Sequence, residues 1–154
     1  MEAMEYIENR TYDEIQVGDS ATLVRTLKPQ DIQLFAIMSG DVNPAHVDPE
    51  YAKSSMFQEV IAHGMWGGAL VSTVRGTQFP GPGTLYIDQT LHFSRPVGLG
   101  DTITVTLTAT RKFDHNHHIL FDCVCTNQDG QKVIGGTAEV LAPTEKIKRA
   151  RIEL

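Results

Sequence analysis

The segment Val60–Val74 is apolar on nearly every side when it is placed on a helix. A helix of this kind is buried over most of its surface, so the rest of the chain must surround it. Its first half contains Gly64, Gly67 and Gly68, and each glycine costs a helix about 1 kcal/mol relative to alanine. Close approach of the helix backbone to another backbone, or to a ligand, is the usual reason for such glycines.

Four segments after this helix have the composition of β-strands. They cover residues 84–93, 102–113, 118–126 and 132–141, in which apolar and β-branched residues recur. Asn127–Gly130 is the clearest hairpin turn between them. Consecutive strands joined by short turns pair antiparallel, so the pattern predicts an α+β fold with a sheet around the helix.

The region before the apolar helix is predicted to hold one more strand and two smaller helices. Residues 20–27 alternate and are rich in β-branched side chains, which indicates a strand. A helix is expected from Pro29 to a stop at Gly40, where glycine suits a left-handed cap. Asp48 is followed by proline and predicts a short helix that runs to about Lys53.

Length and charge narrow the class of protein. At 154 residues the chain is long enough for one domain with its own core, which we place at 1–142. Residues 143–154 are expected to form an extended C-terminal tail or linker. The net charge of -6 argues against nucleic acid as a partner, and no stretch approaches the roughly 20 apolar residues of a membrane span.

The cysteines and the N-terminus predict a cytoplasmic protein. Cys123 and Cys125 share one face of a predicted strand about 7 Å apart, too far for a disulfide, and two thiols alone are too few for zinc. Residues 1–5 are acidic and lack the basic and apolar regions of a secretory signal. We therefore expect buried, reduced thiols.

The run Gly40–His46 is the first candidate for chemistry. Asn43-Pro44 forces a bend between Asp41 and His46, because a residue before proline is pushed out of the helical region; we expect no regular helix here. A carboxylate and an imidazole on a bent loop could hold one water molecule and form a general base. The alternative is structural, with Asp41 capping a turn, Asn43 making an Asx turn and His46 a partly buried, satisfied residue.

Two motifs, Gly-Asp-Val-Asn-Pro-Ala-His within 35–48 and Ile-Ala-His-Gly-Met at 61–65, resemble the MaoC-like (R)-specific enoyl-CoA hydratases. The resemblance covers about residues 12–142 and implies the hotdog fold, a curved antiparallel sheet wrapped around a central apolar helix. More narrowly, residues 6–149 are similar to the first domain of bacterial bifunctional enoyl-CoA hydratase/phosphate acetyltransferase proteins. That likeness implies a fused or associated phosphate acetyltransferase domain as a partner.

The resemblance also implies an activity, the reversible addition of water to a trans-2-enoyl-CoA to give an (R)-3-hydroxyacyl-CoA. Asp41 and His46 occupy the positions of the catalytic pair. The backbone amide of Gly64, at the start of the central helix, occupies the position that receives the thioester carbonyl. Acid–base help and an oxyanion hole suffice for this reaction, so no cofactor or metal is expected. Hotdog domains usually pair through edge strands, which implies a homodimer or a higher homo-oligomer.

Four further residues are candidates for substrate binding. Asn43 is expected to fix the loop, and His63 either supports the oxyanion site or packs at the start of the helix. Met65 and Trp66 either line an acyl pocket or pack the helix on the sheet.

Other polar residues carry weaker signals. Arg95, Lys112 and the basic residues after Pro143 are candidates for binding the phosphates of coenzyme A. His115, His117 and His118 have the composition of a metal cluster, but this stretch reads better as a solvated hairpin connection.

Two other functions stay open. Hotdog acyl-CoA thioesterases often place an acidic residue on the central helix, and no Asp or Glu lies between Glu59 and Asp88 here. A non-catalytic acyl-CoA-binding or assembly domain is the second alternative, and the intact pair of Asp41 and His46 argues against it.

Overall fold

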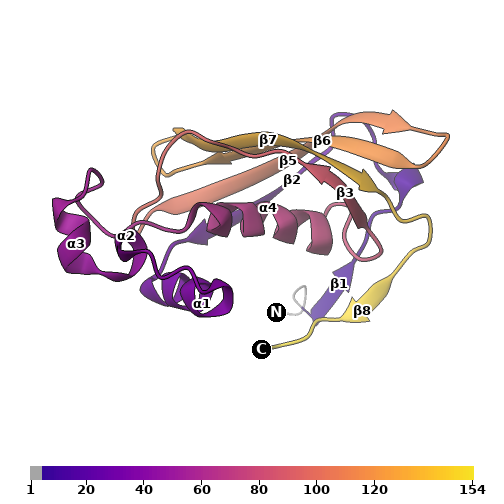
Figure 1. The fold of residues 1–154 in the computed structure, drawn as a ribbon. Coiled ribbons are helices and arrows are strands. Elements are labelled where there is room, and N and C mark those ends of the chain that lie inside the picture. Colours follow the sequence, from indigo (N-terminus) through magenta and orange to yellow (C-terminus); the bar gives the residue numbers. More distant parts are fainter. Residues whose placement is uncertain (1–4) are drawn as a thin grey trace.

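A curved antiparallel sheet lies across one long helix in the computed structural model, which describes residues 5–154 (Figure 1). The helices are α1 (Pro29–Ser39), α2 (Pro44–Val47), α3 (Pro49–Ser54) and α4 (Gly64–Thr77), with a 3-10 turn, η2 (Tyr12–Glu14). The strands are β1 (Tyr6–Glu8), β2 (Ser20–Thr26), β3 (Leu85–Gln89), β4 (His92–Phe93), β5 (Thr102–Phe113), β6 (His118–Thr126), β7 (Lys132–Leu141) and β8 (Lys148–Ala150). The prediction about a signal at residues 1–5 falls almost entirely outside the described residues.

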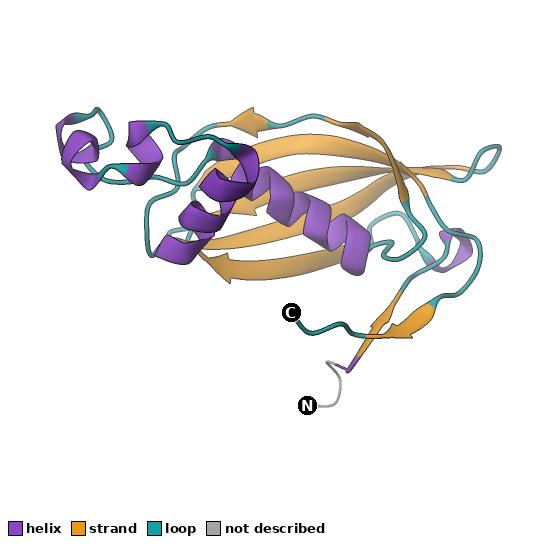
Figure 2. Cartoon of the chain, turned by 60° about the horizontal axis from the view of Figure 1, so that its bottom comes forward, coloured by secondary structure: helices purple, strands orange, loops and turns teal. Residues whose placement is uncertain are grey.

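The main sheet follows the order β2-β5-β6-β7-β3, and β4 pairs with β7 beyond the end of β3. All of these pairs are antiparallel. Along β5 every second side chain from Ile103 to Ala109 is buried, because alternate residues of a strand face the same side. Figure 2 shows α4 lying across one face of the sheet and α1–α3 gathered at one end. The predicted α+β hotdog fold is confirmed.

The central helix meets the sheet through its glycines. Leu70, Val71 and Val74 of α4 are buried in the core. At Gly67 a Cβ atom would collide with the end of the Ile134 side chain on β7, so the glycine lets this side chain pack against the helix backbone. The contact is with a side chain, and the expected close approach to another backbone or to a ligand stays a prediction for Gly67.

One predicted helix and one predicted strand differ in extent from the structure. The apolar segment 60–74 is helical only from Gly64, where the resemblance places the start of the central helix, because Ile61 forms a β-bridge with Gly98 and the backbone of Ala62 bonds to Val97. The expected strand 84–93 is divided into β3 and β4. A register shift interrupts β3, and between the two strands the carbonyl of Thr90 lies directly over Gly136.

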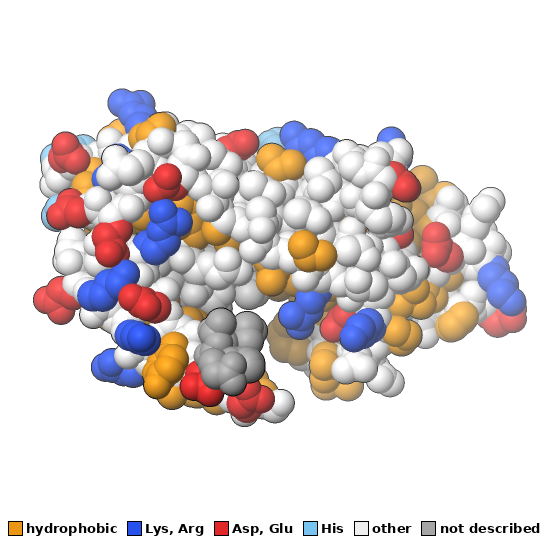
Figure 3. All heavy atoms as spheres, turned by 180° about the vertical axis from the view of Figure 1, so that it is seen from behind, with side chains coloured by type: hydrophobic (Ala, Val, Ile, Leu, Met, Phe, Trp, Pro, Cys, Tyr) orange, Lys and Arg blue, Asp and Glu red, His pale blue; other side chains and the backbone are white. Residues whose placement is uncertain are grey.

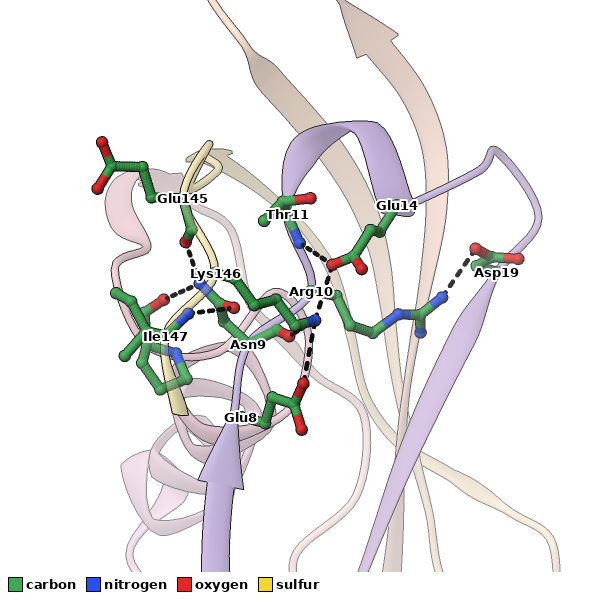
Figure 4. Close-up of polar contacts among 10 residues, drawn as sticks. Glu8, Asn9, Arg10, Thr11, Glu14, Asp19, Glu145, Lys146 and Ile147 are labelled. Carbon is green, nitrogen blue, oxygen red and sulfur yellow. Dashed lines mark hydrogen bonds and ion pairs between the residues drawn. The ribbon is translucent and has the colours of Figure 1, made fainter. Parts of the chain in front are cut away.

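The C-terminal segment is held against the N-terminal residues. Strand β8 pairs with β1 in a two-stranded ribbon below the main sheet (Figure 1). Lys146 Nζ donates to the carbonyl of Asn9 (2.6 Å) and to Glu14 (2.8 Å) (Figure 4). The side-chain nitrogen of Asn9 donates to the carbonyl of Glu145, and its side-chain oxygen accepts from the NH of Ile147. Residues 143–154 are thus extended as expected, but they pack on the body; the domain boundary at 142 stays a prediction.

The buried thiols behave as their strand position predicts. Cys123 and Cys125 are free and fully buried in β6. Burial raises the pKa of both thiols, that of Cys125 to about 12. Within residues 5–154, no helix combines the length and hydropathy that crossing a bilayer requires.

Candidate active site

Three residues, Gly40, Asn43 and Pro44, determine the local conformation of the loop that carries Asp41. Gly40 ends α1 in the left-handed conformation with φ of 80°, as predicted. Asn43 Oδ1 accepts the backbone NH of Ala45 (2.9 Å) and caps α2, so Asn43 fixes the loop. The expectation of no helix through His46 is wrong, because Pro44 fits the first position of a helical turn and places His46 on α2.

The ring of His46 is oriented by a backbone carbonyl. Its Nδ1 lies 2.8 Å from the carbonyl oxygen of Ile61. A carbonyl can only accept, so Nδ1 carries the proton of this bond and Nε2 is left to accept a proton. One ligand atom each from Asp41, His46 and His63 lies within 4.8 Å of the other two. Since Nδ1 is used on Ile61, Nε2 is the nitrogen of His46 that a water molecule beside the Asp41 carboxylate would bond to.

His63 contacts both members of this pair. It is 3% exposed, and its Nε2 donates to the backbone carbonyl of Asp41 at 2.9 Å. Its ring stacks on His46 with the centroids 4.0 Å apart and an interplanar angle of 26°. The side chain of His63 does not cap α4, although the residue stands at the N-cap position.

The start of α4 offers free hydrogen-bond donors. Within the described residues, the backbone NH groups of Gly64 and Met65 have no acceptor, as is usual in the first turn of a helix. The helix dipole adds partial positive charge at this point. Gly64 carries no side chain to obstruct a ligand that approaches these donors.

A cavity of about 260 Å³ lies between the start of α4 and the segment 93–97. Asp41 is exposed and is not part of its lining. His46, His63 and Gly64 line it together with Trp66, which is 7% exposed. Met65 is 54% exposed and is not part of the lining. The arrangement can therefore hold a planar carbonyl compound with an imidazole on one side and free amide donors on the other.

Sequence reasoning missed the residues that act through their backbone or come from distant strands. The carbonyl of Ile61 orients His46, yet a backbone oxygen leaves no signal in the residue type. Phe57 and the segment 93–97 complete the cavity wall, and only the three-dimensional fold brings them to α4.

Of the basic residues expected to bind the phosphates of coenzyme A, the structure places some at the cavity and others away from it. Arg95 lines the cavity. Lys112 lies over the ring of Tyr12 at 4.2 Å, and Lys146 pairs with Glu8 and Glu14, so neither reaches this cavity.

One described cluster has the spacing of a metal site, namely Asp41, His46 and His63. The histidines of the β5–β6 connection form no such group in the described part of the chain; His118 pairs with Glu139 at 2.7 Å. Both histidines of the cluster already use one ring nitrogen on a carbonyl. The expectation that no metal or cofactor is needed stays a prediction.

Comparison with known proteins identifies the class. The family model of the MaoC like domain matches residues 14–124. An (R)-specific enoyl-CoA hydratase of Rhodospirillum rubrum is 43% identical over 86% of this chain and 91% of that protein. The chain therefore belongs to the MaoC-like family.

Solved structures agree with this assignment. The R-hydratase PhaJ1 from Pseudomonas aeruginosa, in the unliganded form, matches with a TM-score of 0.93 and 44% identity over 97% of this chain and 96% of that one. The (R)-hydratase from A. caviae involved in PHA biosynthesis matches with a TM-score of 0.82 and 32% identity over 84% of this chain and 98% of that one. The narrower likeness to bifunctional phosphate acetyltransferase proteins stays a prediction.

Proposed function

We propose that the protein is an enoyl-CoA hydratase, a hydro-lyase that adds water reversibly to a trans-2-enoyl-CoA and forms the (R)-3-hydroxyacyl-CoA. The observation that carries this proposal is the placement of His46: one of its ring nitrogens lies within 4.8 Å of an Asp41 carboxylate oxygen, and its Nε2 has no hydrogen-bond partner within residues 5–154. His46 and Gly64 line the same cavity. The names of the three (R)-hydratase relatives support hydration with the same stereochemistry, and that of the Rhodospirillum rubrum protein also supports an enoyl-CoA substrate.

The first half of the mechanism is attack by water. Nε2 of His46 takes a proton while the water oxygen bonds to the β carbon, and Asp41 holds the water and stabilises the imidazolium that forms. Because Nδ1 is already bonded to Ile61, the ring cannot turn away from the water. General-base help of this kind contributes about 100- to 10,000-fold in rate.

The second half is stabilisation of the enolate and its protonation. Attack at the β carbon moves charge to the thioester oxygen, which the NH of Gly64 and the dipole of α4 stabilise. The α carbon then takes a proton, and the bond between oxygen and carbon collapses back to the carbonyl. Return of the proton held by His46 to the α carbon would make the addition syn.

We also assign the phosphates of coenzyme A to Arg95. Among the described residues that line the cavity, Arg95 is the one cation, and its guanidinium forms no ion pair within residues 5–154. Arg95 is exposed, so its guanidinium can reach a ligand that extends from the cavity into solvent, as the pantetheine arm of a thioester would. Guanidinium and phosphate form strong, paired hydrogen bonds.

The experiment that tests the activity separates hydration from thioester cleavage. Crotonyl-CoA is added, and loss of the enoyl absorbance is followed in parallel with release of free thiol. Hydration predicts loss of absorbance without thiol, and the same rate after treatment with a chelator. Release of thiol would favour the thioesterase alternative. The absence of a carboxylate on α4 argues against that alternative. Binding without either change would favour an acyl-CoA-binding or assembly domain.

The proposed assembly is a homodimer or a higher homo-oligomer. β3 forms one edge of the sheet, and Leu85 and Ile87 on it are 59% and 46% exposed. An open edge with exposed apolar side chains is a site for pairing with a second copy. Light scattering should show at least a dimer, and a stable monomer would contradict this. We further propose a cytoplasmic location, which the free buried thiols support.

A further inference from the structure

The short segment before α4 contacts both members of the catalytic pair. The carbonyl of Ile61 accepts from His46 Nδ1, and the NH of Ile61 donates to the carbonyl of Ala45 at 3.3 Å. Two residues later, His63 Nε2 donates to the backbone carbonyl of Asp41. The next residue is Gly64, which supplies the proposed oxyanion donor. Four consecutive residues thus join the base, the carboxylate and the oxyanion site.

Packing alone does not explain a histidine at position 63. The side chain is 3% exposed and lies between the rings of Phe35 (centroids 4.8 Å apart) and His46. Its Nδ1 is buried and has no hydrogen-bond partner in the described residues. A buried polar atom without a partner destabilises a fold, and an apolar ring of similar size would avoid that penalty. The unpartnered Nδ1 therefore points to a role for the histidine in what its Nε2 and its ring contact.

We propose that His63 is a positioning residue of the hydration reaction, an inference that rests on the proposed function. Its Nε2–H bond holds the backbone of Asp41, and its ring face holds the plane of His46. The carboxylate and Nε2 of His46 are then aimed at the same water. His63 is not itself an acid or base in this scheme, because Nε2 is occupied by Asp41 and Nδ1 is buried.

Two substitutions of His63 test its two contacts one at a time, the hydrogen bond to Asp41 and the stacking on His46. His63→Phe keeps a flat ring against His46 and removes the donor to Asp41. His63→Gln keeps an NH at about the reach of Nε2 and removes the ring. Misplacement of reacting groups by about 1 Å costs on the order of 100-fold in rate. We expect each variant to lose about 10- to 100-fold in kcat for crotonyl-CoA, with KM nearly unchanged.

Two further measurements separate positioning from packing and from binding. Calorimetric titration with butyryl-CoA, which has no double bond to hydrate, should give the wild-type affinity in both variants. The Tm of the His63→Phe variant should equal or exceed that of the wild type, because the unpartnered Nδ1 is gone.

The outcomes are distinct. Wild-type kcat in both variants would overturn the role of His63 and leave the hydratase proposal standing. A fall of kcat together with Tm and affinity in both variants would show that His63 only supports the fold, which also overturns it. Absence of hydration by the wild-type enzyme would overturn the proposed function and, with it, this inference.

Discussion

Two polar clusters at opposite ends of the molecule differ in how many of their polar groups have a hydrogen-bond partner. In the ribbon of β1 and β8, Lys146 pairs with Glu14 (2.8 Å) and Glu8 (3.4 Å), and Asn9, at 1% exposure, uses both its amide nitrogen and its oxygen (Figure 4). At the start of α4, by contrast, His63 Nδ1 is unpartnered within the described residues, and so are the NH groups of Gly64 and Met65.

The surface reflects the same difference. Basic and acidic side chains are interspersed around the ribbon end, while hydrophobic side chains gather over the end formed by α1–α3 (Figure 3). Ile37, Met38 and Met56 there are 75%, 72% and 87% exposed. Satisfied polar groups fix a structure, whereas groups without an internal partner are available to a ligand or a partner subunit. The comparison therefore points to the start of α4 as the functional end.

The largest effect is expected at the catalytic pair. Asp41→Asn retains an oxygen for the NH of Asn43, and His46→Asn retains an NH for the carbonyl of Ile61, so both variants should fold. Each should lose about 100- to 10,000-fold in kcat for crotonyl-CoA, because general-base help is removed. Near-normal turnover in either variant, with a wild-type Tm, would remove that residue from the mechanism.

The next effect tests the free amide at Gly64. His63 has φ of -60° and ψ of 136°, which suits a residue before proline, and proline is well accepted at the first position of a helix. Gly64→Pro therefore removes the NH without breaking α4 and should cost about 100- to 1000-fold in kcat.

Gly64→Ala is the matched control for this variant. It keeps the NH and adds a Cβ at 3.4 Å from Phe93, so most of the activity should remain. Equal losses in the proline and alanine variants would mean that the added carbon, and not the missing donor, is responsible.

A smaller effect is expected at Arg95. Arg95→Ala should raise KM for crotonyl-CoA about 10-fold, the equivalent of about 1.4 kcal/mol. KM for the crotonyl thioester of pantetheine, which has no phosphate, should stay the same. KM for crotonyl-dephospho-CoA, which lacks only the 3′-phosphate, shows whether Arg95 binds that phosphate or the pyrophosphate. Lys112→Ala is the control and should leave both values unchanged. An equal rise in KM with pantetheine would contradict phosphate recognition.

The smallest effect belongs to the ribbon, where charges are paired. The hydrogen bond from Lys146, followed by the backbone NH of Thr11, lowers the pKa of Glu14 from its ordinary 4.5 to about 2. A lowered carboxyl pKa stabilises the fold above pH 4.5, and this contribution is lost as the pH falls from 4.5 to about 2.

Hydrogen exchange in β8 measures this contribution of Glu14 to stability. The protection factors of the β8 amides should fall as the pH is lowered from 4.5 to about 2. Lys146→Met should lower the protection at pH 7 and remove most of the acid dependence, with hydration unchanged. Acid-independent protection in the wild type would contradict the role of this ion pair.

Much of the architecture could be predicted because it follows from local rules. The all-apolar segment with its glycines predicted a buried helix in close contact with the sheet, and the β-branched runs predicted β5, β6 and β7 with their bounds. The apolar pattern alone extended the helix back to Val60, because hydropathy does not distinguish a helix from the β-bridge at Ile61. The contacts of 143–154 depend on pairing with β1, across nearly the whole chain, which no local pattern encodes.

The candidate site shows the same limit. Asp41, His46 and Gly64 were found from their motifs; the structure brings Asp41 close to His46, and His46 and Gly64 line one cavity. Neither the choice among the basic residues nor the contacts of His63 could be predicted, because both depend on which strands and loops meet at α4. Met65 was expected to line the pocket or pack on the sheet, and its side chain is largely exposed.

The most direct test of the account is the configuration of the product formed from crotonyl-CoA by the wild-type enzyme. Chiral chromatography of the hydrolysed product should show (R)-3-hydroxybutyrate in large excess, and the Asp41→Asn variant should form almost none in the same time. An excess of the (S) acid, a racemic product, or free coenzyme A with unchanged crotonate would contradict the proposal that this end of the molecule directs water to one face of the substrate.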